Sequence, residues 1–323
     1  MTAVNNVKEP DVLVHFRKHR KSKRVTSSLT GLTFKQFEVL LPFFEEAKLK
    51  SQELRLQNKE IKRIQSGGKA GFLFSTYIQL FFILFYLKNY MTFDVLGSIF
   101  GFTSAEAHKH VDSLLPVLAQ ALSSSGHLPA TQFSSPEELR KALGSSLEAL
   151  IDATECQCVR PSDKQKQKQR YSGKKKRHTV KSLIVTKADK TVVMISLIVS
   201  GAMHDYALLK EIFDPAKPWF KKITAYVDLG FLGIMTDYTD TNGVKIPYKK
   251  PRRSKKNPNP QLTKSQKKYN KKQASIRVSV ENVLAGMKSF HCLSHRIRNH
   301  LDLFINYFFG VSAGLWNFKN AVK

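Results

Sequence analysis

The segment LEALIDATECQCV, residues 147–159, decides the fold, because it places an aspartate within an apolar run that has the length and composition of a strand. The next apolar stretch, HTVKSLIVTKADKTVVMISLIVSG at 178–201, has β-branched residues on both sides of a turn at 188–190, which predicts a hairpin. Further elements are expected in the order helix, strand, strand and long helix, over residues 204–213, 222–231, 244–251 and 264–290. This order predicts an α/β fold in which helices pack on a mixed sheet.

The residues ahead of this region have helical periodicity, from Leu29 to about Leu122. Their most apolar window, 72–87, is about 15 residues long and falls short of the ~20 that span a bilayer, so it predicts a buried helix. The first residues do not place a charged start before an apolar core. We therefore expect no signal peptide, and a cytoplasmic protein of the cell interior.

Residues 92–122 predict two helices in succession. A short helix ends at Gly101, and Thr103 or Ser104 can cap a longer one. A helix, a turn of about four residues that holds a glycine, and a longer helix form the helix-turn-helix arrangement, with an ordinary helical hairpin as the alternative. In the first interpretation the second helix presents polar side chains to DNA, namely Glu106, His108, Lys109 and Asp112.

Composition along the chain divides it into four parts. A basic tail, 1–27, is centred on HFRKHRKSKR, and a helical domain with the helix-turn-helix follows over 28–125. Residues 126–144 are expected to be a linker, which begins in a stretch rich in Ser, Gly and Pro. The α/β domain is expected over 145–315.

The chain of 323 residues carries 53 Lys and Arg against 25 Asp and Glu, a formal net charge of +28. This charge argues against an enzyme of neutral metabolites and points to a polyanion, of which nucleic acid is the commonest. Residues 160–181 contain ten basic residues and one acid, and residues 245–272 contain twelve basic residues and no acid. Either run alone could be a solvated loop, but together they predict a track for phosphate backbones.

Three carboxylates occupy positions that are unusual for surface acids. Asp152 follows the apolar run LEALI and Asp228 follows ITAYV, so each lies at the end of an apolar strand run. A buried carboxylate is costly unless cations or strong donors lie nearby. Glu281 shares one stripe of the long helix with Arg277 and Lys288, because a turn of about 100° per residue places all three within roughly 40°. An isolated stripe of this kind could also be a surface ladder of ion pairs.

Carboxylates from three different elements are the ligands that a pair of hard divalent cations requires, which predicts two Mg²⁺ or Mn²⁺ ions. Two such ions clamp the attacking and leaving oxygens of a phosphoryl displacement, and the basic runs would hold the DNA strands. The three cysteines exclude a disulfide scaffold. The C-x-C at 156–158 has no second ligand pair, so we expect no zinc.

At these residues the chain resembles bacterial insertion-sequence DDE transposases, in particular the insertion sequence five group and its Harbinger-like relatives. The resemblance covers roughly residues 28–315. Its motifs are LIDATE around Asp152, YSGKKKRHTVK (171–181), GAMHDYALLKE (201–211), AYVDLGFLGI around Asp228 and RIRNHLDLF (296–304). The family's Tyr-x2-Arg-x3-Glu-x6-Lys signature is also present, except that its first position is Ala274 instead of Tyr.

The resemblance implies an RNase H-like catalytic domain, a mixed sheet flanked by helices, preceded by an all-α helix-turn-helix domain. It implies that Asp152, Asp228 and Glu281 are catalytic and hold the metal ions. By the same resemblance, Arg277 and Lys288 contact transposon-end DNA.

Other side chains are candidates for weaker roles. His204 and Asp205 are expected at a helix start, where they could support the metal site. Further DNA contacts are expected from basic residues of the helix-turn-helix and of the two basic runs: Lys109, Lys174, Lys175, Lys176, Lys249, Lys250, Arg252 and Arg253.

The expected function is that of a DNA transposase. Such an enzyme binds the terminal inverted repeats of an insertion sequence as double-stranded DNA, cleaves at the element ends and joins the freed 3′-OH to target DNA. We expect a homodimer or larger assembly on DNA, no membrane association and no small-molecule substrate. The alternatives are a nuclease that does not integrate, and a domesticated, non-catalytic DNA-binding protein, against which three intact acids argue.

Overall fold

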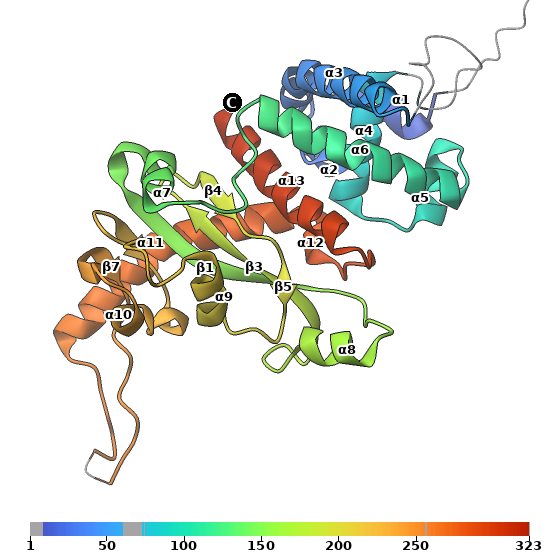
Figure 1. Cartoon of the computed structure of the whole chain (residues 1–323). Coiled ribbons are helices and arrows are strands. Elements are labelled where there is room, and N and C mark those ends of the chain that lie inside the picture. The colour runs from blue at the N-terminus through green and yellow to red at the C-terminus, as the bar shows by residue number, and fades with distance from the viewer. Residues whose placement is uncertain (1–8, 61–72, 74, 256, 323) are drawn as a thin grey trace, which may run out of the picture. The chain divides into compact units, whose positions relative to one another are not determined.

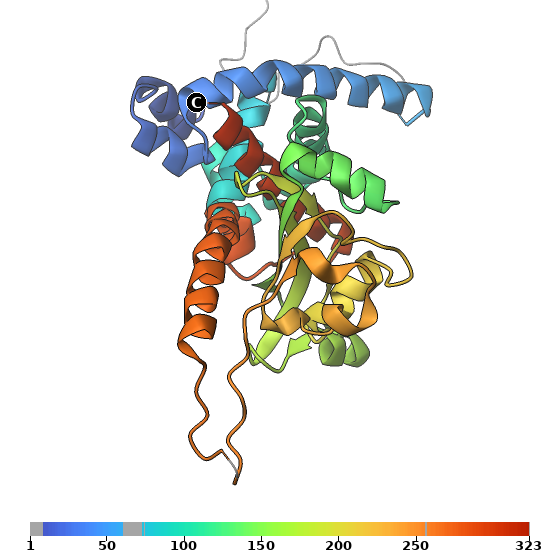
Figure 2. The same cartoon turned by 90° about the vertical axis from the view of Figure 1, so that its left-hand side faces the viewer.

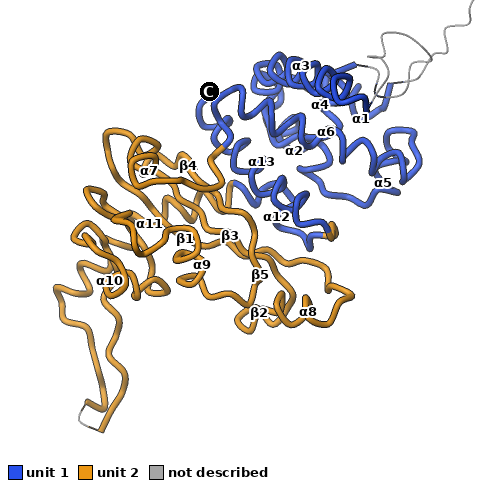
Figure 3. Tube along the Cα trace, viewed as in Figure 1, with its two compact units in different colours: residues 1–128, 287–297, 301–323 blue, residues 129–286, 298–300 orange. Residues whose placement is uncertain are grey.

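A computed structural model of the chain describes residues 9–60, 73, 75–255 and 257–322, which form two compact units (Figures 1 and 3). Unit 1 comprises the described residues of 1–128, 287–297 and 301–323, and unit 2 comprises those of 129–286 and 298–300. The change of unit near residue 128 lies close to the start of the expected linker. The expected α/β domain extended to residue 315, whereas most of the chain after residue 286 packs with the N-terminal helices.

Unit 1 is entirely helical within its described residues. Its helices are α1 (Asp11–Lys18), α2 (Lys23–Thr30), α3 (Phe34–Gln57), α4 (Thr76–Asn89), α5 (Phe93–Phe100), α6 (Ser104–Ser124), α12 (His291–Ser294) and α13 (Asp302–Ala321). Helices α1 and α2 lie largely within the segment expected as a basic tail. They fold because Leu13 and Phe16 are fully buried, and the Phe16 ring contacts the rings of Phe37 and Phe81.

Helix α4 is the buried helix expected from its apolar sequence. Its residues from Leu80 to Leu87 are all buried, and it packs against α2, α3, α6 and α12. A helix that is apolar on every side needs neighbours on every side, which explains why unit 1 needs several helices around α4. Of the helices in the described part of the chain, none is both long and apolar enough to cross a bilayer.

Helices α5 and α6 form the predicted pair around a tight turn. Gly101 ends α5 with φ +76°, a left-handed conformation that glycine adopts without strain. Thr103 then starts α6 with a reciprocal cap: its side chain accepts from the Glu106 N–H at 3.2 Å, and its own N–H donates to Glu106 Oε2 at 2.9 Å. The helix boundaries predicted from residues 101–104 are thereby confirmed.

Helix α13 joins unit 1 through packing and hydrogen bonds from the far end of the chain. The amide of Gln36 on α3 donates to the Lys319 carbonyl at 3.1 Å and to the Val322 carbonyl at 2.7 Å. Asn317 donates to the His127 carbonyl at 3.0 Å. A methyl group on Gly314 would lie 3.1 Å from the Leu122 side chain, so a glycine lets α13 approach α6 closely.

Unit 2 is built on a mixed sheet, as predicted. Its strands are β1 (Glu148–Gln157), β2 (Tyr171–Ser172), β3 (Arg177–Thr186), β4 (Val192–Ile195), β5 (Val199–Ser200), β6 (Thr224–Tyr226) and β7 (Val244–Lys245). Strand β1 lies centrally, antiparallel to β3 and parallel to β6, and β6 pairs in parallel with β7. The predicted hairpin is β3 and β4, which pair antiparallel. Strand β6 is shorter than expected, because the chain turns into a 3-10 helix at Leu229–Phe231.

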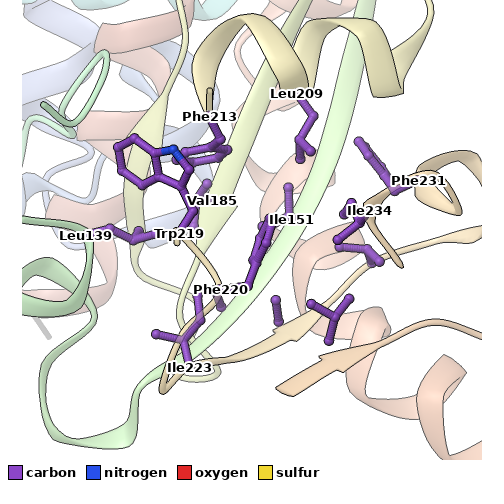
Figure 4. Packing of buried hydrophobic residues seen from close by; sticks show 14 of the residues in the cluster. Leu139, Ile151, Val185, Leu209, Phe213, Trp219, Phe220, Ile223, Phe231 and Ile234 are labelled. Carbon is purple, nitrogen blue, oxygen red and sulfur yellow. The ribbon is translucent and has the colours of Figure 1, made fainter. Parts of the chain in front are cut away.

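Helices flank this sheet: α7 (Pro136–Leu143), α8 (Lys164–Arg170), α9 (Asp205–Ile212), α10 (Ile234–Asp237) and α11 (Lys264–Lys288). One face of the sheet packs on the apolar cluster in Figure 4, which includes Ile151 of β1, Val185 of β3 and Leu209 of α9. Side chains alternate along a strand, so Asp152 points to the opposite face from Ile151. The apolar core therefore holds β1 in place from the face opposite the one that carries Asp152.

Between β7 and α11 the chain leaves the sheet and returns as an extension (Figure 2). Its two legs are joined near the base, where Asn270 accepts from the Tyr248 N–H at 2.8 Å and donates to the Tyr248 carbonyl at 2.9 Å. The Tyr248 and Tyr269 rings lie edge to face with centroids 5.2 Å apart. The extension thus has a fixed base, although it adds no strand to the sheet.

Candidate active site

Asp152 lies in the middle of β1, with its side chain 19% exposed. One carboxylate oxygen accepts from the Ala153 N–H at 2.8 Å, and the other lies 3.3 Å from Nη2 of Arg277 on α11. Burial raises the pKa of Asp152, and the neighbouring Asp228 and Asp205 carboxylates also raise it, whereas the Ala153 N–H and Arg277 lower it. Three carboxylates from β1, the β6 turn and α9 therefore interact electrostatically.

Asp228 is held by the turn that follows β6. It caps the 3-10 helix at Leu229–Phe231, and Oδ1 accepts from the Gly230 N–H at 2.6 Å. A methyl group on Gly230 would lie 2.9 Å from this oxygen and 3.9 Å from Oδ2 of Asp205. Glycine at 230 therefore lets the two carboxylates approach the same point of the backbone.

Asp205 starts α9 and is fixed by a buried lysine. Nζ of Lys181 on β3 lies 2.8 Å from Asp205 Oδ1 and donates to the Met203 carbonyl at 2.6 Å. Lys181 is 8% exposed, so the ion pair compensates a charge that would be costly to bury alone. Sequence reasoning listed Asp205 only as a supporting residue and missed Lys181. The signal for Lys181 was a lysine preceding the apolar run SLIV of an expected strand.

Helix α11 carries the other three predicted residues of the site. Arg277, predicted to contact DNA, forms the ion pair with Asp152 and has a side chain only 17% exposed. Glu281 follows one turn later and is exposed, and Lys288 ends the helix and is partly buried. The structure thus brings Asp152, Asp228 and Asp205 into electrostatic range of one another.

No three His, Cys, Asp or Glu side chains of the described residues stand close enough together to hold one metal ion. The chemistry of the donors nevertheless fits a divalent cation. Asp152 and Asp228 offer oxygen ligands. Burial and, to a smaller extent, repulsion from Asp228 raise the pKa of Asp152, and a bound cation would favour its charged form. In this structure the Arg277 guanidinium supplies part of the positive charge that a bound cation would bring.

The other expected residues fall into two groups. His204 is exposed at the N-cap of α9, and Glu155 faces away from Asp152 and accepts from the Thr179 hydroxyl at 2.5 Å. The expected DNA-contact residues outside α11 are all exposed: Lys109 on α6, Lys174, Lys175 and Lys176 in the turn before β3, and Lys249, Lys250, Arg252 and Arg253 on the extension.

The exposed side chains of α6 differ in their freedom to contact another molecule. Glu106 is engaged in the helix cap. His108 packs its ring against Phe93, with centroids 4.8 Å apart, and lies 3.4 Å from Asp112. Lys109 projects beside them toward α3. Of the four residues expected to face DNA, Lys109 is therefore the best placed to bind an anion.

Comparison with known proteins gives matches over both units. Residues 151–317 match the model of the family described as DDE superfamily endonuclease, and residues 73–124 match the helix-turn-helix of DDE superfamily endonuclease. The second range contains α4, α5 and α6. A probable transposase for insertion sequence element IS702 from Microchaete diplosiphon is 26% identical over 247 residues, 76% of this chain and 81% of that relative. No solved structure matches the chain.

Proposed function

This chain belongs to the DDE superfamily endonucleases, and from that premise we propose that it is the transposase of an insertion sequence. It binds the terminal inverted repeats of its element, cuts the DNA at the element ends and transfers the freed 3′-OH to a target duplex. The observation that carries the proposal is the position of Asp152 and Asp228, two interacting carboxylates within the endonuclease match, in a chain that also has a helix-turn-helix. The similar probable transposase supports the same function.

In this proposal Asp152, Asp228 and Glu281 hold two Mg²⁺ or Mn²⁺ ions. When bound, such ions lower the barrier to phosphoryl displacement by stabilising charge on the attacking and leaving oxygens. Asp228 keeps its carboxylate in place through the Gly230 N–H. Asp205, oriented by Lys181, places a further negative charge beside it, and His204 lies next to Asp205 at the exposed start of α9. Glu281, exposed on α11, completes the set.

Different basic residues contact different parts of the DNA. Lys109 contacts DNA beside the helix-turn-helix, while the turn at Lys174–Lys176 and the extension contact phosphates without reading bases. Arg277 pairs with Asp152, and it would contact the DNA strand if cations occupied the site. Lys288 contacts the same transposon end. The protein acts as a homodimer or larger assembly, because an element has two ends, and it works on chromosomal DNA in the cytoplasm.

The test uses the full chain and a duplex that carries one end of the element. Wild-type protein is expected to cleave this duplex only with Mg²⁺ or Mn²⁺ and to join the product to a plasmid target. Asp152→Asn and Asp228→Asn are expected to bind the duplex and leave it uncut. Cleavage without joining would identify a nuclease, and binding without cleavage by the wild type would identify a non-catalytic DNA-binding protein.

A further inference from the structure

A groove of about 420 Å³ lies within unit 1, between α3 and α6. Six of its lining residues carry groups that can donate hydrogen bonds: Lys48, Ser51, Gln52 and Arg55 from α3, and Lys109 and Ser113 from α6. None of these six belongs to the catalytic site, only Lys109 is among the expected DNA contacts, and α3 lies outside the range that matches the family's helix-turn-helix. The groove is therefore a feature that the family match does not explain.

The charges in the groove favour an anion. Lys48 is partly buried, and burial and the nearby Arg55 guanidinium both lower its pKa. Lys109 approaches from the other wall, so three cationic groups face one opening. Like charges brought together in a partly desolvated site repel each other, and an anion between them removes that repulsion.

Two acidic side chains, Asp112 and Glu60, lie at or beside the groove. Asp112 lines it with one carboxylate oxygen 3.4 Å from His108 Nε2, and burial raises the pKa of Asp112. Glu60 lies 3.4 Å from Nε of Arg55. Glu60 offsets part of the Arg55 charge, and the three cations still outnumber the two acids Asp112 and Glu60, so the groove stays positive.

The neutral donors indicate which anion fits. The Ser51 hydroxyl and the Gln52 amide lie beside the cations, whereas the Ser113 hydroxyl already donates to the His110 carbonyl at 3.0 Å. A group with several oxygens can accept from the cations, the Ser51 hydroxyl and the Gln52 amide at once. A phosphodiester has this form, and α6 is the longer helix of the helix-turn-helix, the one that enters the major groove in this motif. The phosphates of DNA line both edges of the major groove, so Lys109 would lie beside them when α6 is docked there.

We propose that the groove between α3 and α6 is a binding site for one backbone phosphate of double-stranded DNA. This proposal rests on the proposed function, since it assumes that α6 docks on DNA. The phosphate lies between Lys48 and Lys109 and accepts from Ser51. It fixes how α6 enters the major groove and adds no preference for base sequence, because phosphate contacts position a protein on DNA without reading it.

The experiment measures DNA binding by the full-length protein over a series of salt concentrations. The probes are an element-end duplex and a scrambled duplex of the same length. Lys48→Gln is compared with Lys50→Gln, which changes an exposed lysine on the same helix that pairs with Glu46 at 2.5 Å. Lys48→Arg tests whether the charge alone is enough. Thermal unfolding of each variant confirms that it is folded.

Lys48→Gln is expected to weaken binding of both duplexes by the same factor, roughly 5–10-fold near physiological salt. It should also reduce the slope of log K against log salt by about 0.9, the value for one lost phosphate contact. Lys48→Arg should retain most of the affinity, and Lys50→Gln should bind as the wild type does.

An unchanged slope in Lys48→Gln, with normal cleavage by the wild type, would overturn the phosphate site and leave the proposed function standing. Loss of affinity for the element end alone would also overturn it, because the groove would then be reading bases. If the wild type binds neither duplex, the proposed function fails and the phosphate site fails with it.

Discussion

Asp228 depends on a single neighbouring residue for its position. Its carboxylate accepts from the Gly230 N–H, and the space next to that oxygen is free only because residue 230 has no side chain. Asp152 differs, since a strand and an arginine on α11 hold it. The two central carboxylates are thus fixed by different means, one by a turn and one by a sheet.

Gly230→Ala should therefore act on catalysis more than on folding. The new methyl group would lie 2.9 Å from Asp228 Oδ1 and must displace it. A misplacement of about 1 Å in a catalytic group lowers a rate by roughly 100-fold, so we expect cleavage to slow by that order. Gly173→Ala, at a site where a methyl group meets no atom within 4 Å, is the matched control and should cleave normally. Equal rates for the two variants would contradict this account of the turn.

Glu281 gives a second prediction at this scale. Glu281→Gln should abolish cleavage while thermal stability and DNA binding stay as in the wild type, because the side chain is exposed. Glu211→Gln, which changes an exposed acid on α9, serves as the control. If Glu281→Gln still cuts and Asp205→Asn does not, Asp205 is the third catalytic carboxylate.

Among the elements, the longer helix of the helix-turn-helix has the strongest start signal. Thr103 and Glu106 exchange hydrogen bonds between side chain and backbone, and a third bond joins the two side chains at 2.9 Å. Thr92 caps α5 with one bond of 3.5 Å. These two caps should differ in their contribution to stability.

Thr103→Ala is expected to lower the free energy of unfolding by about 1 kcal/mol, the usual value for a lost N-cap. Thr92→Ala should lower it less, because its cap is longer and is not reciprocated. Urea unfolding followed by circular dichroism measures both. A larger loss for Thr92→Ala would show that the cap geometry does not set these stabilities.

The sequence predicted elements well where local signals were strong. The β3–β4 hairpin, helix α11 and the α5–α6 pair were all expected from periodicity, turn residues and caps, and the mixed sheet is confirmed. Strand β6 was expected to be longer, because its apolar pattern continues into a turn that Asp228 and Gly230 create. The Lys181–Asp205 pair joins residues 24 positions apart through tertiary packing, which no local pattern reveals.

At the scale of the whole molecule, unit 1 requires residues from both ends of the chain. The Gln36 amide binds two carbonyls of α13 and its following residue, and Phe308 packs against Tyr86 and Tyr90 of the N-terminal helices. No helix was predicted over residues 302–321, and no local pattern says which unit α13 joins. Packing decides that, over more than 200 residues of separation.

A chain that ends after residue 301 should therefore lose the structure of unit 1 and keep that of unit 2. Hydrogen exchange is expected to become fast across α3 and α6 and to stay slow in β1 and β3. The point variant Phe308→Ala should lower unfolding free energy by about 3–5 kcal/mol. Protection of α3 and α6 in the shortened chain would mean that unit 1 folds without α13.

Acidification should also lower the stability of unit 1 first. Burial lowers the pKa of His110, His127 and His291 from the usual 6.5, so the folded protein binds fewer protons than the unfolded chain as the pH falls below about 6.5. The unfolded state is thereby favoured, and stability should fall between pH 7.5 and pH 5.5. Urea midpoints at these pH values measure the loss, which should be smaller in His110→Gln. A midpoint that rises on acidification would contradict this sign.

The two-ended construction of unit 1 has a consequence during synthesis on the ribosome. Residues 129–286, which form nearly all of unit 2, emerge and can fold while the helices of residues 9–124 still lack α12 and α13. At about 5–20 residues per second, the last 37 residues follow within seconds, and only then can unit 1 close. Until that moment the carboxylates of unit 2 are in place, but the helix-turn-helix of unit 1 lacks a complete core. Only a chain translated through α13 would then bind DNA firmly.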